Sequence, residues 1–256
     1  MSGAAMKLFD LSGKVAIVTG STRGIGLAIA RAMQDHGAKV VISSENAEDC
    51  TATGFRLQTF SIPADVTDET QLAALVDGTI DHFGGLDILV CNAGITGKPG
   101  PFASVEMDDY DRVMAINLRS QVRLCNLALP HIADRGGGAA VLISSLSGLR
   151  GNAAINAYAL AKAGVAQLAR NLAVEWGPRN IRVNALSPGF IRTDLSAPLL
   201  ANEAFMAKRM QMTPLRRPGE VEEVAGAALF LASPAGAFVT GHNLVIDGGT
   251  VITDGQ

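Results

Sequence analysis

The sequence predicts an α/β fold: a single Rossmann-type, doubly wound parallel sheet of about seven strands with helices on both faces. Short runs rich in Val, Ile and Leu alternate with longer segments of helical periodicity from Lys14 to Ile246, a pattern typical of successive βαβ units. The strand runs are apolar at nearly every position, as strands covered on both faces should be. The 256 residues contain no linker-like stretch, so we expect one dinucleotide-binding domain spanning residues 1–256.

Seven segments carry the strand pattern. They are Val15–Thr19, Lys39–Ser43, Leu57–Ile62, Leu86–Cys91, Ala139–Ser144, Ile181–Leu186 and Asn243–Ile246. Helices are expected between them, including one over Ile25–His36 and one from about Asn152 to Trp176. Residues 190–217 break the alternation, because apolar residues and prolines follow an expected strand there. We interpret this segment as a small helical lid over a substrate.

Composition and charge exclude several classes of protein. Lys and Arg total 21 against 24 Asp and Glu, without a run of like charges, so nucleic acid is not an expected partner. No apolar stretch is long enough for a membrane span, and the N-terminus lacks the apolar core of a signal peptide. The three cysteines form no C-x-x-C pair, and the four histidines have no metal-ligand spacing. We therefore expect a cytoplasmic protein with no membrane partner and no metal.

A glycine-rich loop follows the first predicted strand. It consists of Thr19, Gly20, Ser21, Thr22, Arg23, Gly24, Ile25 and Gly26. Glycines at such a turn let a pyrophosphate approach the backbone N–H groups at a helix N-terminus. The spacing G-x-x-x-G-x-G differs from the commoner dinucleotide fingerprint, so by itself it fits an ordinary βα turn equally well.

The end of the second strand bears on the choice of dinucleotide. An acidic residue there would bind the ribose 2′-hydroxyl of NAD(H), whereas a neutral or basic site admits the 2′-phosphate of NADP(H). Ser43 and Ser44 together with Arg23 favour the phosphate, because arginine can pair with it bidentately. Glu45 favours the hydroxyl. On balance we expect NADP(H) to be favoured over NAD(H).

One of the two tyrosines has a lysine one helical turn away. Tyr158 and Lys162 share a helix face at i,i+4 spacing, where a cation lowers the pKa of a phenol and prepares it for general acid/base catalysis. Ser145 follows the fifth strand, at the edge where open parallel sheets bind ligands. Taken alone, Ser145 also fits a turn cap, and Tyr158 also fits a packed aromatic residue.

Together these residues resemble the short-chain dehydrogenase/reductase family over nearly the whole chain. The loop at 19–26, Asn92-Ala93-Gly94 after the fourth strand, and Ser145 with the Tyr158-x-x-x-Lys162 pair are similar to the family's motifs. Further positions resemble family residues that meet the adenine, complete the catalytic tetrad and close over the nicotinamide. These are, in turn, Asp65 and Val66; Asn117; and Pro188, Gly189, Ile191 and Thr193.

The resemblance implies an NAD(P)-dependent oxidoreductase that interconverts a ketone or aldehyde and a secondary alcohol. It implies that Tyr158 exchanges a proton with the substrate oxygen and that Ser145 hydrogen-bonds this oxygen. Lys162 would bind the nicotinamide ribose and keep the tyrosine pKa low, and Asn117 would anchor a water. The glycine loop would hold the pyrophosphate side, with Asp65, Val66, Asn92, Ala93 and Gly94 around the adenine and its ribose.

Two features depart from the family pattern. Cys91 stands where the family usually has an asparagine, and we interpret it as a small buried residue without a nucleophilic role. The stretch 45–56 is short for the helix that the family has between strands two and three.

Two alternative functions remain open. One is reduction of a 3-oxoacyl thioester on an acyl carrier protein, since Ser44-Glu45-Asn46 is similar to such reductases and Arg150 or Arg192 would suit a carrier phosphate. The other is a non-catalytic regulatory protein that binds a dinucleotide.

Apolar residues also suggest the substrate and the assembly. Leu146, Leu149 and Phe102, with the apolar residues of the lid, favour a hydrophobic or medium-sized carbonyl or alcohol substrate. The helix carrying Tyr158 is apolar on nearly every side, so its outer face is expected to meet a second subunit, together with the helix around 111–129. The family commonly assembles as dimers or tetramers, and we expect a homotetramer.

Overall fold

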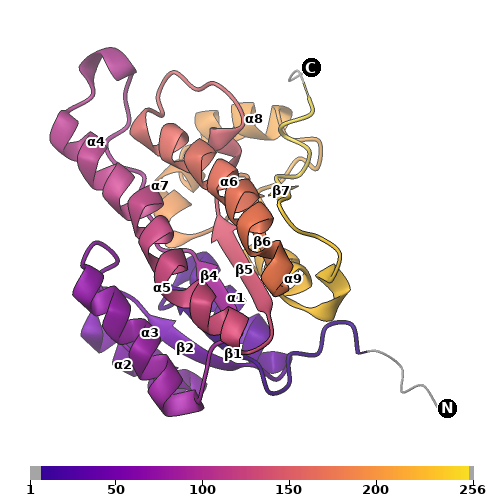
Figure 1. The fold of residues 1–256 in the computed structure, drawn as a ribbon. Coiled ribbons are helices and arrows are strands. Elements are labelled where there is room, and N and C mark those ends of the chain that lie inside the picture. The colour runs from indigo at the N-terminus through magenta and orange to yellow at the C-terminus, as the bar shows by residue number, and fades with distance from the viewer. Residues whose placement is uncertain (1–6, 254–256) are drawn as a thin grey trace.

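The computed structural model describes residues 7–253, which contain one seven-stranded sheet with helices on both faces (Figure 1). The strand order is β3-β2-β1-β4-β5-β6-β7, and every neighbouring pair is parallel. The chain therefore starts in the middle of the sheet and winds outward in both directions, as in dinucleotide-binding folds. The predicted fold class is confirmed.

The strands follow the predicted segments closely. They are β1 Val15–Thr19, β2 Lys39–Ser43, β3 Phe60–Ser61, β4 Ile88–Cys91, β5 Gly138–Ile143, β6 Ile181–Pro188 and β7 Asn243–Ile246. The third predicted strand, 57–62, is too long. Leu57 ends the preceding helix, and Gln58 turns the chain in a left-handed conformation, with φ at 51°, so only two residues pair with β2.

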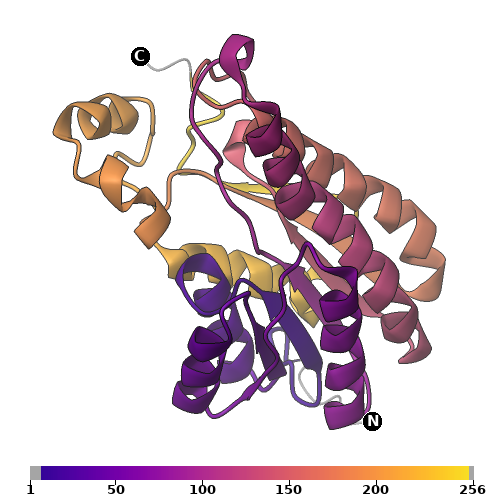
Figure 2. The same ribbon diagram turned by 90° about the vertical axis from the view of Figure 1, so that its left-hand side faces the viewer.

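Nine α-helices lie within the described residues. They are α1 Gly24–Asp35, α2 Ala47–Leu57, α3 Glu69–Phe83, α4 Met107–Met114, α5 Ser120–Asp134, α6 Ala157–Trp176, α7 Ala197–Leu200, α8 Glu203–Gln211 and α9 Val221–Ala232. Figure 2 shows α1 beside α9 on one side of the sheet, with α5 and α6 on the other. None of these helices is long and apolar enough to cross a membrane.

One predicted helix, α6, begins later in the chain than expected. α6 starts at Ala157 rather than near 152, because the Asn156 side chain accepts a hydrogen bond from the Ala157 N–H and caps the helix there. The stretch between strands two and three forms α2, which has 11 residues and begins at an Asn46 cap that accepts from the Asp49 N–H.

The core forms two layers, one on each face of the sheet. Along β1, Val15 and Ile17 pack with residues of α3, α5 and α6, whereas Ala16 and Val18 pack with residues of α1 and α9. Successive strand residues point to opposite faces, so both sets of side chains are buried. This explains why the strands are apolar throughout, and it leaves the loops at the carboxyl ends of the strands to carry polar chemistry.

A buried carboxylate joins elements at the opposite, amino-terminal edge of the sheet. Asp87 accepts hydrogen bonds from the Val15 N–H at 3.0 Å, from Lys14 Nζ at 3.1 Å and from Arg135 at 3.1 Å. Its side chain is 3% exposed. These contacts tie the start of β1 to the turn after α5.

We expect Asp87→Asn to lower the free energy of unfolding by about 2 kcal/mol, because two cations lose their shared, desolvated partner. Denaturant unfolding measures this change. Asp134→Asn is the matched control, since Asp134 pairs with Arg179 but is 75% exposed and should cost below about 0.5 kcal/mol. Equal losses in the two variants would contradict the role given to Asp87.

Candidate active site

A cleft of about 440 Å³ opens at the carboxyl ends of the central strands. It is lined by residues from the loops after β1, β2, β3, β4 and β6, from α4 and the turn that follows it, and from β5 and α6. The sequence-predicted residues among them are Gly20, Thr22, Arg23, Gly24, Ile25, Ser44, Asp65, Val66, Asn92, Ala93, Gly94, Asn117, Tyr158, Lys162 and Thr193. The topology therefore brings most of the predicted site together in one place.

The glycine loop is packed against the end of β4. Gly20 has a positive φ of 62°, and a Cβ on Gly26 would overlap the Gly20 carbonyl oxygen and Asn92 Nδ2. Asn92 Nδ2 donates to the carbonyl oxygens of Thr19 and Gly20, both at 3.0 Å. Thr19 Oγ1 in turn accepts from the backbone N–H groups of Asn92 and Ala93. These hydrogen bonds fix the glycine loop to the segment that follows β4.

Several predicted cofactor residues support the cleft from behind. Ser21 Oγ donates to the Val18 carbonyl at 2.6 Å and accepts from the Ser43 N–H at 2.9 Å. Thr19, Ser21, Gly26 and Ser43 are all buried, and the Ser43 hydroxyl is enclosed without a hydrogen-bond partner among the described residues. The idea that the Ser43 hydroxyl favours a 2′-phosphate therefore does not fit its position, because it does not reach the cleft.

The cleft is charged at the end of β2. Ser44 Oγ donates to Glu45 Oε2 at 2.9 Å, and both residues line the cleft with Arg23. Arg23 is exposed and has no ion pair within residues 7–253. Asp65 Oδ1 accepts from the N–H and the hydroxyl of Thr67, both at 2.8 Å.

Tyr158 and Lys162 lie on the first turns of α6 and face the cleft. Lys162 Nζ lies 5.6 Å from the centre of the Tyr158 ring and donates to the Ile143 carbonyl at 2.7 Å. Ser144 Oγ donates to the Lys162 carbonyl at 2.7 Å, and Asn156 Nδ2 donates to the Gly100 carbonyl at 3.1 Å. The helix start is thus fixed to β5 and to the loop after β4.

Burial controls the ionisation of both groups. It raises the pKa of Tyr158, and the side chain of Ser145 only partly opposes this shift. It also lowers the pKa of Lys162 to about 8. The expectation that Lys162 lowers the tyrosine pKa is wrong for this structure. Desolvation of the phenolate dominates, and the lysine amine is directed to a backbone carbonyl.

Ser145 begins a single helical turn, η3 Leu146–Gly148, and its hydroxyl accepts from the Ser147 N–H at 3.1 Å. It is 9% exposed, beside the carboxyl end of β5. Ser145 thus caps the turn, and its side chain also interacts with Tyr158.

Asn117 lies in a π-helical turn, Ala115–Arg119, that joins α4 to α5. Its Nδ2 donates to the carbonyls of Ile95 at 2.9 Å and Val113 at 3.0 Å, and its Oδ1 accepts from the Ile95 N–H. A Cβ on Gly94 would lie 2.5 Å from Asn117 Oδ1. The asparagine therefore positions the loop after β4, and such π-turns are frequent at functional sites.

Cys91 lies outside the cleft lining and is buried. Cys91 is 2% exposed, and both the neighbouring Cys125 thiol and burial raise its pKa, so its thiolate is disfavoured. Within the described part of the chain, no three His, Cys, Asp or Glu side chains are grouped as metal ligands.

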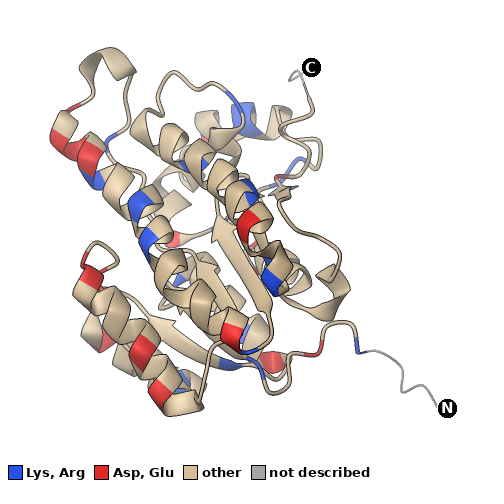
Figure 3. Cartoon of the chain, viewed as in Figure 1, with Lys and Arg blue, Asp and Glu red and all other residues tan. Residues whose placement is uncertain are grey.

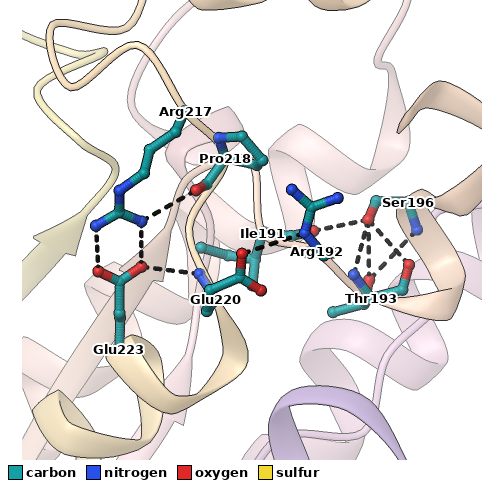
Figure 4. Close-up of polar contacts among 8 residues, drawn as sticks. All are labelled: Ile191, Arg192, Thr193, Ser196, Arg217, Pro218, Glu220 and Glu223. Atoms are coloured by element: carbon teal, nitrogen blue, oxygen red, sulfur yellow. Dashed lines mark hydrogen bonds and ion pairs between the residues drawn. The ribbon is translucent and has the colours of Figure 1, made fainter. Parts of the chain in front are cut away.

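The segment 190–217 is anchored at both ends near the start of α9 (Figure 4). Ile191 and Gly219 form a parallel bridge. Arg192 pairs with Glu220 at 3.1 Å, and Arg217 forms two bonds to Glu223, at 2.7 and 2.6 Å. Between these anchors, α7 and α8 project away from the sheet (Figure 2).

Some cleft residues were not found by sequence reasoning. They are Ala64, Ile95, Arg112, Ile116, Ile143 and Asp194. Ala64, Ile95 and Ile143 are ordinary apolar positions just after, or at the end of, a strand, so only the topology marks them. Leu195 was expected only as one of the apolar residues of the lid. Ser145, Pro188, Gly189 and Ile191 were predicted at the site but lie outside the cleft lining. Ser145 follows β5, and the other three lie where β6 leads into the 190–217 segment.

The cleft fits a nicotinamide dinucleotide. The glycine loop leaves a cradle that a Cβ on Gly20 would narrow, since it would lie 3.0 Å from Ala93 Cα. Arg23, which forms no ion pair within residues 7–253, lines the cleft together with Tyr158 and Lys162. Phosphates at the N-terminus of α1 would meet unpaired backbone N–H groups.

Comparisons with known proteins agree with this geometry. A family profile described as Enoyl-(Acyl carrier protein) reductase matches residues 20–251. Cis-4-hydroxycyclohexanecarboxylate dehydrogenase of Sinomonas cyclohexanicum is 44% identical over 244 residues, covering 92% of this chain and 96% of that protein. The 7alpha-hydroxysteroid dehydrogenase of Escherichia coli is 39% identical over 246 residues, covering 94% and 95%.

Solved structures show the same fold with bound cofactors. Gluconate 5-dehydrogenase from Burkholderia cenocepacia, in complex with NADP and tartrate, has a TM-score of 0.93 at 34% identity, covering 98% of this chain and 100% of that chain. A 7alpha-hydroxysteroid dehydrogenase with NADH and 7-oxo glycochenodeoxycholic acid has a TM-score of 0.88 at 38% identity, covering 94% and 95%. The chain thus belongs to the short-chain dehydrogenase/reductase family of oxidoreductases.

Proposed function

We propose that this protein is an alcohol dehydrogenase or carbonyl reductase that uses NADP(H) in preference to NAD(H). It would interconvert a ketone or aldehyde and a secondary alcohol. The observation that carries the proposal is that Tyr158 and Lys162 line the same cleft as the glycine loop. Binding a dinucleotide requires only the loop, whereas a phenol at the other end of the cleft serves proton transfer.

The bound cofactor supplies or accepts the hydride at the substrate carbon. Tyr158 donates a proton to the carbonyl oxygen in reduction and takes it back in oxidation. Burial raises the pKa of Tyr158, so the phenol is protonated at neutral pH, which suits the reductive direction. Ser145 hydrogen-bonds the same oxygen, Lys162 holds the nicotinamide ribose, and Asn117 keeps the loop after β4 in place and anchors a water.

Preference for NADP(H) is supported by Arg23 and Ser44 at the end of β2. The Arg23 guanidinium is exposed beside the cleft and is available for a 2′-phosphate, to which it can bind bidentately. Glu45, which favours a ribose hydroxyl, accepts a hydrogen bond from Ser44. One structural relative was solved with NADP and another with NADH, so the choice rests on these three residues.

The segment 190–217 would serve as the substrate lid. Its two ends are fixed at α9, and Leu195 and Leu199 expose 64% and 44% of their surface, so a substrate beneath the lid would cover apolar area. The relatives are named for cyclic or polyhydroxylated secondary alcohols. We infer a hydrophobic or medium-sized ring alcohol, or the matching ketone, as the substrate.

A 3-oxoacyl thioester on an acyl carrier protein is the second candidate substrate. The description of the matching family names an acyl carrier protein, although with an enoyl rather than a 3-oxoacyl group. Arg192, one of two arginines considered for a carrier phosphate, is already paired with Glu220. Comparing turnover of an acetoacetyl thioester with that of a cyclic ketone separates the two candidates, and turnover of neither across a broad carbonyl panel would favour a non-catalytic binding protein.

The outer face of α6 supports the proposal of a homotetramer. Leu160 is 48% exposed and Val174 is 81% exposed on this helix. Figure 1 shows α6 on the outside of the sheet with no further layer over it. A second copy packed on this face would remove these side chains from water.

We expect Tyr158→Phe to lower turnover by at least ~100-fold while the dissociation constant for NADPH stays within about twofold, because only the proton donor is removed. Steady-state kinetics and fluorescence titration measure the two quantities. Tyr110→Phe, at the other tyrosine of the chain, is the matched control and should keep its turnover. An unchanged rate in Tyr158→Phe would refute the assignment.

We expect Arg23→Gln to lower the ratio of kcat/KM for NADPH to that for NADH by about tenfold to a hundredfold, because one charged bond to the 2′-phosphate is lost. Arg31→Gln removes the same charge from an exposed position of α1 and should leave the ratio unchanged. A wild-type preference for NADH would instead make Glu45 the ribose-binding residue.

We expect Lys162→Met to raise stability at neutral pH while abolishing turnover. The folded pKa of Lys162 is about 8 against a usual 10.5, so burying the ammonium costs about 3 kcal/mol below pH 8. Between pH 8 and 10.5 the unfolded chain binds the extra proton, so wild-type stability rises with pH and the gain in the variant shrinks. Thermal melts across this range test it, with exposed Lys208→Met as control.

A further inference from the structure

The loop after β4 connects the cleft to the start of α6. Residues 95–100 of this loop follow residues 92–94, which line the cleft. At the other end of the loop, the Gly100 N–H donates to the Ala154 carbonyl at 2.9 Å, four residues before Tyr158. One short loop therefore contacts both the cleft and the approach to the helix that carries the tyrosine.

Asn156 fastens this loop to α6. Its Nδ2 donates to the carbonyls of Lys98 at 3.3 Å and Gly100 at 3.1 Å. Its Oδ1 accepts from the Ala157 N–H at 2.6 Å. The residue is only 4% exposed, and buried polar groups that lose their partners are costly. The Asn156 amide is therefore held in one orientation, with its donors on the loop and its acceptor on the helix.

Asp109 holds the same loop from a second helix, α4. Figure 3 shows acidic residues on the first turns of α4, where Asp109 lies. Its Oδ2 accepts from the Lys98 N–H at 2.7 Å, and the residue is 7% exposed. Gly97 has a φ of 68°, and a Cβ there would lie 2.8 Å from Asp109 Oδ2. The N–H and the carbonyl of Lys98 are thus bound by buried side chains from two different helices.

We propose that Asn156 and Asp109 are positioning residues for proton transfer. Through the loop between them, they keep the Tyr158 hydroxyl in a set place relative to a cofactor bound along residues 92–94. The inference rests on the proposed function, because that function assigns the proton to Tyr158. Misplacing a reacting group by about 1 Å can slow a reaction a hundredfold, so loss of this tie is expected to slow the chemistry and to spare cofactor binding.

A helix cap alone would require less of Asn156. The cap uses only the acceptor Oδ1, whereas the tie to the loop uses the two donors on Nδ2. Asn156→Asp separates the two roles. An ionised aspartate keeps the acceptor for the Ala157 N–H but offers no donor to the carbonyls of Lys98 and Gly100. When its carboxyl gains a proton, one donor returns.

The first test follows kcat of Asn156→Asp with the best ketone of the carbonyl panel. At pH 8 we expect a loss of about tenfold to a hundredfold, while the dissociation constant for NADPH stays within about twofold. Burial raises the pKa of a carboxyl, so activity relative to the wild type should recover toward pH 5, as the new carboxyl is protonated and donates to the loop.

Asn152→Asp is the matched control for this test. Asn152 is exposed in the same connection, and its Oδ1 accepts from the Ala154 N–H, so the substitution keeps that acceptor. It should retain the wild-type kcat at every pH. A wild-type kcat for Asn156→Asp at pH 8, or a loss that is the same at every pH, would overturn the inference.

The second test does not need turnover. Hydrogen exchange followed by mass spectrometry, on the full chain saturated with NADPH, reports the protection of residues 95–104 and 157–166. We expect Asp109→Ala to speed exchange in both segments, although its hydrogen-bond partners, Lys98 and Arg112, lie outside α6. Asp108→Ala, at the adjacent exposed position, should change neither segment.

Unchanged exchange in residues 157–166 of Asp109→Ala would overturn the coupling between loop and helix. If exchange changes as expected while the wild type reduces no carbonyl compound, the tie between loop and helix stands and the proposed reaction is wrong.

Discussion

The hydrogen bond from Lys162 Nζ to the Ile143 carbonyl is the contact on which the site depends. Ile143 is the last residue of β5, so this bond joins the helix that carries Tyr158 to the sheet that carries the glycine loop. The Ser144 hydroxyl reinforces it from the other side by donating to the Lys162 carbonyl. Tyr158 therefore keeps a fixed place relative to the loop, and a buried amine, which disfavours folding while charged, is retained for this purpose.

The cations that line the cleft occupy three different environments. Lys162 is buried and bound to a backbone carbonyl, Arg23 is exposed beside the glycine loop, and Arg112 pairs with Asp109. Three carboxylates, Glu45, Asp65 and Asp194, line the same cleft, so the cleft has no excess of positive charge. Arg23, which forms no ion pair within residues 7–253, is therefore the cation best placed to meet an anionic group of a ligand.

Local patterns made the glycine loop and the Tyr158 and Lys162 pair predictable, because neighbours in sequence determine both. Contacts between distant segments were not predictable. The start of α6 depends on Asn156, which reaches a carbonyl 56 residues away. Ser43 is buried, and its N–H donates to the side chain of Ser21, 22 residues earlier in the chain. The direction of the Tyr158 pKa shift follows from burial, which helical spacing does not reveal.

Arg209 on α8 and the two arginines at the base of the lid are held in different ways. At the base of the lid, Arg192 and Arg217 are each paired with a glutamate of the α9 region (Figure 4), so these positions are fixed whether or not a ligand is present. On α8 the guanidinium is positioned by Phe190 and has no counterion within residues 7–253. The base of the lid is therefore fixed by ion pairs, whereas Arg209 on α8 is positioned by an aromatic ring. The part of the lid that must move for a substrate to enter thus carries the fewer polar anchors.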